Sequence, residues 1–152
     1  MLNLTRKTEY ALLALRGLGQ QPERLYSARQ IAERYNIPET LLAKVLQRLK
    51  GGGLVASVKG AAGGYRLSKS HDEILLTDVL ALFAEQTYLV DCMADEPACA
   101  CEQLYHCDIR EPLEALNALL VAQLRGLTLA SFYRAGPEWK SPSSLSIHKS
   151  PG

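Results

Sequence analysis

Two short helical patterns joined by a tight turn constrain the fold of this chain more than any other feature. The first covers 28–35, with Ser27 as its predicted N-cap, and the second covers 39–50. The connection Asn36-Ile37-Pro38 is short, and Pro38 suits the start of a helix because its missing N–H costs little there. Apolar residues recur in the second pattern at steps of three and four. This arrangement predicts a helix-turn-helix whose second helix buries one stripe, formed by Leu42, Val45, Leu46 and Leu49.

A β-hairpin is predicted directly after the second helix, which ends at three consecutive glycines. Leu54–Lys59 is apolar and β-branched enough to form a strand, and Tyr65–Leu67 returns the chain after a glycine-rich turn. Lys59 and Arg66 place positive charge on this hairpin. A helix-turn-helix followed by such a hairpin, called a wing, predicts a mainly α, winged helix-turn-helix fold.

Further helices are predicted on both sides of this unit. Residues from Leu4 to about Gly19 fit an amphipathic helix, and Ile74–Glu85 is helical by pattern. Asp108 and Glu111 are three apart and resemble a capping box that opens another helix. The predicted apolar sets are Leu4, Tyr10, Ala11, Leu13, Leu15 and Leu18 in the first, Leu76, Val79, Leu80 and Phe83 in the second, and Ile109, Leu113, Leu116, Leu120 and Leu124 in the third.

The last apolar stripe is long and lies at the end of a small domain, so it needs a partner surface. Docking within the chain is one interpretation. We prefer a homodimer, because helix-turn-helix proteins commonly read two half-sites. The predicted organisation is a winged helix-turn-helix domain at 1–86, a cysteine loop at 87–107, a long C-terminal dimerisation helix with a following short helix at 108–135, and a flexible tail at 136–152.

The charge is strongly polarised, although the net charge is +1. Residues 1–70 hold 12 Lys and Arg against 4 Asp and Glu, whereas residues 71–152 hold 5 against 12. A basic amino-terminal half favours a nucleic-acid partner; unevenly distributed solvated charge is the alternative. No stretch approaches the roughly 18–20 apolar residues of a membrane span, and the charged start lacks a signal-peptide core. We therefore expect a cytoplasmic protein with no membrane partner.

Candidate DNA contacts lie on the second helix of the helix-turn-helix and on the wing. Thr40 and Lys44 are one turn apart and suit base edges in the major groove, whereas Gln47 and Arg48 lie further along and suit the phosphate backbone. A basic wing tip commonly enters the minor groove. Each residue alone is also compatible with a solvated surface position. The predicted DNA-binding set is Ser27, Thr40, Lys44, Gln47, Arg48, Lys59, Gly60 and Arg66.

Four cysteines fall within sixteen positions, from Cys92 to Cys107. In a reducing compartment such a group favours metal ligands or reactive thiols over structural disulfides. Thiolates suit iron–sulfur clusters or zinc. The spacing alone does not select a metal, although it differs from a standard zinc knuckle.

Four segments carry a family resemblance: LTRKTEYALLAL, SARQIAERYNIP, LLAKVLQRLKGGGLVASVKGAAGGYRLSK and the cysteine loop. Together they resemble the Rrf-type winged-helix regulators of bacteria, which include IscR, NsrR, RirA and the SUF-operon regulators. The resemblance covers residues 1 to about 133. It implies a homodimeric regulator of operator DNA, typically a repressor, in which Thr40 and Lys44 read the operator and Lys59 enters the minor groove. Ala43 replaces a glutamate that the iron–sulfur-assembly regulator uses for selectivity, which leaves the operator preference open.

The resemblance also implies an iron–sulfur cluster, 2Fe-2S or 4Fe-4S, that senses redox state, nitric oxide or iron. Cluster-binding members carry three cysteines, the last two separated by five residues, and Cys101 and Cys107 fit this rule. Cys92 fits the first position, although eight residues separate it from Cys101 where five is usual. Cys99 is an extra thiol that either replaces Cys101 or remains a redox-reactive neighbour.

A fourth ligand is also expected from the resemblance. Glu9 matches an amino-terminal carboxylate that nitric-oxide-sensing relatives supply from the other subunit; an exposed helix carboxylate is the alternative. Arg110 occupies the position of a histidine ligand in the assembly regulator and cannot ligate. His106 is near but out of register.

Three other functions compete with a cluster-based regulator. The first is a regulator switched by cysteine oxidation, and the second is a module that binds a metabolic enzyme. An iron–sulfur enzyme or carrier is the third and is disfavoured, because no phosphate loop or nucleophile–base pair is visible. We therefore predict no catalytic residues.

Overall fold

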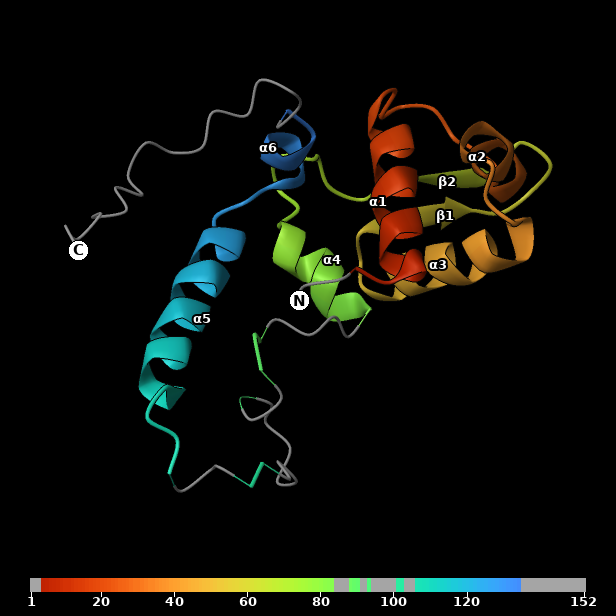
Figure 1. The fold of residues 1–152 in the computed structure, drawn as a ribbon. Helices are drawn as coiled ribbons and strands as arrows, with labels where there is room; N and C mark the ends of the chain where they lie inside the picture. Colours follow the sequence, from red (N-terminus) through yellow and green to blue (C-terminus); the bar gives the residue numbers. More distant parts are fainter. Residues whose placement is uncertain (1–3, 84–87, 91–92, 94–100, 103–105, 135–152) are drawn as a thin grey trace.

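The computed structural model describes residues 4–83, 88–90, 93, 101–102 and 106–134. The elements within these residues are α1 (Arg6–Gly19), α2 (Ala28–Tyr35), α3 (Glu39–Gly51), β1 (Val55–Val58), β2 (Gly64–Leu67), α4 (Leu76–Leu82), α5 (Arg110–Arg125) and α6 (Leu129–Arg134). We call α1–α4 with β1 and β2 the head. Figure 1 shows α5 beside α4, at the edge of the head. Among the helices in these ranges, none has the length and apolar character needed to cross a membrane.

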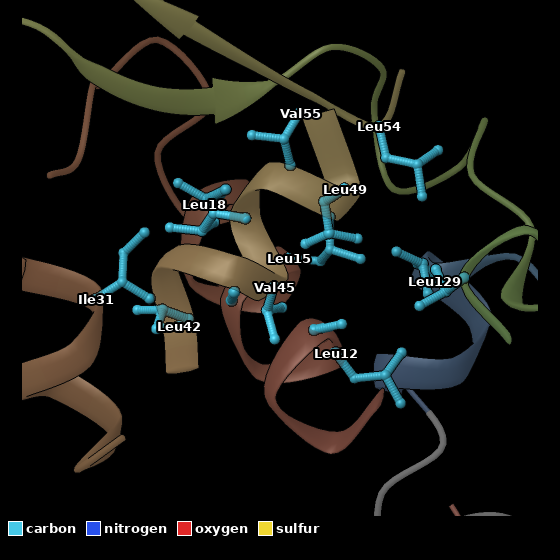
Figure 2. Packing of buried hydrophobic residues seen from close by; sticks show 14 of the residues in the cluster. Leu12, Leu15, Leu18, Ile31, Leu42, Val45, Leu49, Leu54, Val55 and Leu129 are labelled. Atoms are coloured by element: carbon cyan, nitrogen blue, oxygen red, sulfur yellow. The ribbon is translucent and has the colours of Figure 1, made fainter. Parts of the chain in front are cut away.

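α1 lies at the centre of the head and packs against α2, α3, α4 and β2. Because it has so many neighbours, its buried face is wider than one stripe, and Leu12 and Ala14 are buried although neither was predicted to be. Of the predicted set, Leu4 is 40% exposed, and Tyr10 and Leu13 are only half-buried. The fully buried leucines that join α1 to α3, several of them labelled in Figure 2, are Leu15, Leu18, Leu42, Leu46 and Leu49.

α2 and α3 form the predicted helix-turn-helix, and the predicted bounds of α2 are confirmed. Ser27 Oγ accepts a hydrogen bond from Gln30 N at 3.1 Å, and Gln30 Oε1 accepts one from Ser27 N at 2.9 Å. This capping box fixes where α2 begins. Asn36, in the left-handed conformation with φ 52°, fixes where it ends. Pro38 is the N-cap of α3, one residue before the helix.

β1 and β2 form the predicted antiparallel hairpin, with Val55 opposite Leu67. β1 is shorter than the predicted segment 54–59. The hairpin also pairs with the residue before the cap of α2: Tyr26 N donates to Tyr65 O at 3.0 Å, and Tyr65 N donates to Tyr26 O at 2.8 Å. These two bonds attach the wing to the helix-turn-helix.

Gly64, the first residue of β2, permits this attachment. A Cβ at Gly64 would lie 2.7 Å from the carbonyl oxygen of Tyr26. We therefore expect Gly64→Ala to lower the free energy of unfolding by about 1–3 kcal/mol, measured by urea denaturation. Gly51→Ala is the control, because a Cβ there meets no atom within 4 Å and alanine favours the helix. Equal losses in both variants would contradict this account.

α4 is shorter than the helix predicted over 74–85. The chain before it is extended and pairs with the segment after α5. Leu129 N donates to Ile74 O at 2.8 Å, and Leu76 N donates to Leu127 O at 2.8 Å. The apolar character of Ile74 therefore reflects complete burial outside a helix. The predicted last residue of this helix lies outside the described residues.

The predicted capping box at the start of α5 is wrong. α5 begins at Arg110, and its N-cap is Ile109, which makes no side-chain cap bond. The amide of Leu113 donates to Ile109 O at 3.0 Å, so the helix starts one residue later than the box requires. Asp108 precedes the cap, and Glu111 is the second helical residue rather than the third.

Candidate nucleic-acid interface

The outer face of α3 presents the polar residues predicted to meet DNA. Thr40, Lys44 and Gln47 are exposed, and they lie opposite the buried stripe of the same helix. Within the described part of the chain, no side-chain hydrogen bond or ion pair is recorded for these three residues. A polar helix face of this kind, free to bond to an external partner, fits the major groove.

Arg48 lies on the flank of α3 that faces α4. Its guanidinium carbon is 5.8 Å from the centroid of the Phe83 ring, within the range of a cation–π contact. The guanidinium group of Arg48 therefore already has an aromatic neighbour within the head. Its predicted role at the DNA backbone stays a prediction.

The wing turn carries Lys59 and Gly60, both exposed. Gly60 has φ 114°, a conformation that favours glycine, and its carbonyl accepts from Gly63 N at 3.0 Å. In Figure 1 the turn between β1 and β2 and the first turn of α3 both lie on the side of the molecule away from α5. A partner on that side could touch both.

Arg66 lies away from the wing turn, opposite Ala56 in the hairpin. It lines an open cleft of about 910 Å³ between β2, the loop after α1, the segment 68–73 and α6. Two acidic side chains in this cleft already have partners. Asp72 pairs with Arg134 at 3.5 Å, and Ser70 donates its N–H and hydroxyl to Glu73, both at 2.9 Å, which lowers the pKa of that carboxyl. Sequence reasoning did not predict this cleft.

Ser27 is half-buried, and its hydroxyl oxygen accepts the cap bond of α2. The hydroxyl proton can still be donated, so the predicted contact of Ser27 with DNA is compatible with capping. The position is at a helix amino terminus, which favours anions.

Three candidate metal ligands lie within the described residues, and they do not form a complete metal site. Cys101 is exposed and Cys107 is half-buried, and both are free thiols. Glu9 lies in the first turn of α1, with its carboxylate 3.1 Å from Arg6. Across the described ranges, no three His, Cys, Asp or Glu side chains gather in a way that could hold a metal ion. Cys92 and Cys99 lie outside these ranges. The free thiols of Cys101 and Cys107 are suitable ligands for a soft metal ion and would supply part of such a site.

α5 presents an apolar face to solvent. None of its residues is buried, and Leu116, within the predicted stripe, is 47% exposed. Leu113 and Leu124 of the same stripe are half-buried, and Leu124 packs against the hydrophobic core of the head. The large exposed side chains are Ile109, Leu116, Leu119 and Leu120.

Three polar residues with structural roles were missed by the sequence analysis. His71 and Tyr133 bond to carbonyl oxygens of α1, and Asn117 Oδ1 accepts from Leu89 N at 3.0 Å. Asn117 could have been noticed as a polar residue beside the α5 stripe. For His71 and Tyr133 the local sequence carries no comparable signal.

Comparison with known proteins relates this chain to regulators of transcription. The model of the Rrf2 family, described as an iron-dependent transcriptional regulator, matches residues 4–135. The transcriptional regulator NsrR of Shouchella clausii is 33% identical over 81% of this chain and 88% of its own. The structure of CymR, the global cysteine regulator of B. subtilis, covers 90% of this chain and 99% of its own, with 26% identity and a TM-score of 0.71. T. potens IscR covers 92% and 93%, with 25% identity and a TM-score of 0.65.

Proposed function

Because the chain belongs to the Rrf2 family of winged-helix transcription regulators, we propose that it binds operator DNA as a homodimer and senses its signal through an iron–sulfur cluster. The family consists of regulators, and the chain is not an enzyme. The proposed function has four components: the operator contacts, the dimer, the cluster and the signal that the cluster detects. Each rests on a different set of residues.

The exposed polar face of α3 carries the DNA-binding part of the proposal. Lys44 is at its centre, between Thr40 and Gln47, and its ammonium group can donate to guanine acceptors. Lys59 at the wing turn would add a minor-groove contact. The basic amino-terminal half of the chain would strengthen binding through the phosphate backbone.

Lys44→Ala tests this assignment. Selection from a random duplex library should yield an operator, and the variant should bind it about tenfold more weakly because one base contact is lost. Lys50→Ala is the matched control: Lys50 is also exposed on α3 but lies near its carboxyl end, outside the polar face. Affinity measured by fluorescence anisotropy should change little for Lys50→Ala. A tenfold loss confined to Lys50→Ala would overturn the assignment.

The proposed organisation keeps the winged helix-turn-helix domain at 1–86, the cysteine loop at 87–107, the dimerisation segment at 108–135 and a tail at 136–152. The exposed leucines of α5 support a dimer, because a contiguous apolar face on a small domain favours a partner. A second copy would bring a second α3, as recognition of two half-sites requires.

The cysteines carry the sensing part of the proposal. Cys92, Cys101 and Cys107 would hold the cluster, with Glu9 of the partner subunit as the oxygen ligand and Cys99 as a neighbouring thiol. The free thiols of Cys101 and Cys107 support this set. When bound, an iron–sulfur cluster would supply a centre that reacts with oxidants or nitric oxide. A carboxylate is a weak ligand for such a centre, so it would leave one position readily accessible.

A regulator without a cluster is the second candidate. It is favoured by the exposure of the Cys101 thiol and by the similarity to CymR, a cysteine regulator. In that case a reversible change of thiol oxidation would alter DNA binding in protein free of iron. Iron and sulfide analysis of protein purified without oxygen distinguishes the two candidates.

A further inference from the structure

The short helix α6 and the segment before α4 are each joined to α1 by one side chain. The hydroxyl of Tyr133 donates to Leu12 O at 2.6 Å, and Nε2 of His71 donates to Leu15 O at 2.7 Å. Each bond reaches a carbonyl of α1, at positions three residues apart on one face of the helix. Burial raises the pKa of Tyr133, so its hydroxyl stays protonated and keeps its donor.

α1 also leaves space for the imidazole of His71. A Cβ on Gly19 would collide with the ring, so the glycine is required by this contact. The rings of His71 and Tyr133 meet edge to face, with centroids 4.9 Å apart. Ala130 N donates to His71 O at 3.0 Å, which joins α6 to the same residue through the backbone. We call Gly19, His71 and Tyr133 the α6 junction.

The junction lies within a few residues of the carboxyl end of α5. α5 ends at Arg125, and the chain then pairs with the start of α4 through Leu127 O and Leu129 N. Leu129 is completely buried beside the head. The last turn of α5 is therefore separated from a firmly packed segment by very few residues.

The rest of α5 is held much less closely. None of its residues is buried, and α4 is its main neighbour in the head. Asn117 adds the single recorded side-chain bond from the middle of α5 to the described segment 88–90. The closest attachment of α5 to the head is therefore at its carboxyl end, where the chain continues into the packed segment 127–134.

We propose that His71 and Tyr133 are positioning residues for operator binding, which fix α5 relative to the head and so set the distance between the recognition helices of two paired copies. This inference rests on the proposed dimer that reads two half-sites. Binding at the second half-site is effectively intramolecular, so its gain depends on geometry. A loosened junction leaves each α3 able to bind its own half-site but lowers the gain from the second.

The test compares affinity for a selected full operator with affinity for a duplex that contains one half-site. We expect His71→Met and Tyr133→Phe each to lower the full-to-half affinity ratio about threefold or more, since each removes one hydrogen bond at the junction. His71→Gln can keep a donor near the position of Nε2 and should stay close to the wild-type ratio. The half-site affinity should stay within about twofold in all three.

The full-to-half affinity ratios of the variants and of the wild type decide whether the inference holds. An unchanged ratio in folded His71→Met and Tyr133→Phe overturns the inference, and so does an equal loss at full and half sites, which would indicate damage to the head alone. A wild-type ratio near one overturns the proposed paired reading of DNA together with this inference. Thermal unfolding identifies variants that fail to fold, and Tyr133→Phe is the mildest change if His71→Met does.

Discussion

Cys107→Ala is expected to reduce the iron and sulfide content of protein purified without oxygen to background. The change removes one of three proposed thiolate ligands, and mutation of residues that only hydrogen-bond to metal ligands already costs about 10–100-fold in metal affinity. The visible absorbance between roughly 320 and 450 nm should disappear with the metal. Because Cys107 precedes α5 and is only half-buried, the head should remain folded.

Cys99→Ala is the matched control for this experiment. It removes a thiol from the same loop but leaves the proposed set Cys92, Cys101 and Cys107 intact, so its iron and sulfide content should equal that of the wild type. Loss in Cys99→Ala with retention in Cys101→Ala would exchange the roles of these two residues. A colourless wild type with no iron or sulfide would reject the cluster and leave the thiol-based regulator as the candidate.

The same variants test how cluster loading relates to DNA affinity. Any ligand that changes operator affinity must interact differently with the two states of the protein. If loaded protein and Cys107→Ala bind the operator with different affinity, Cys99→Ala should behave as the wild type does. Equal affinity in all three would separate the cluster from DNA binding.

The helix-turn-helix was predictable because its signals are local. The bounds of α2 follow from a cap at Ser27 and a left-handed residue at Asn36, both adjacent to the helix. The buried stripe of α3 follows from its periodicity, since one side of the helix meets the core and the other meets solvent. These elements needed no information from distant parts of the chain.

The errors in α1 and α4 occur where distant segments meet. The start of α4 depends on pairing between Leu75 and Thr128, which no local pattern around Leu75 reveals. The wide buried face of α1 results from covering by several elements, including α6 through Tyr133. At α5 the sequence offered a plausible cap at Asp108, but the first helical bond starts from Ile109.

The candidate site was predictable to a similar extent. The exposed positions of Thr40, Lys44 and Gln47 follow from helix periodicity, and that of Lys59 follows from the wing turn. The cleft around Arg66 depends on how α6 returns to the head, so it could not be predicted. The ligand set of the cysteine loop stays a prediction, because spacing does not determine which thiols converge.

Leu116→Glu is expected to weaken the homodimer by at least about a hundredfold, because each copy would bury a new, unpaired carboxylate at the apolar face of α5. Leu116 is 47% exposed in the single chain, so the same change should cost the isolated fold little. Loss of the dimer should also remove the gain from a second half-site, and affinity for the full operator should fall toward that for half an operator. Sedimentation velocity over a range of concentrations measures the change.

Ala118→Glu is the control that makes this result specific to the apolar face. Ala118 is also exposed on α5 but lies on the side of the helix opposite Ile109. The nine positions from Ile109 to Ala118 correspond to about two and a half turns at about 3.6 residues per turn, so the two side chains point in opposite directions. Ala118→Glu introduces the same charge into the same helix, so any general effect on helix stability or solubility should appear in both variants. Dissociation of Leu116→Glu alone would identify the stripe as the dimer contact. Equal behaviour of the two variants would show that the exposed leucines of α5 serve another purpose, and the chain would then have to pair its recognition helices through a different surface.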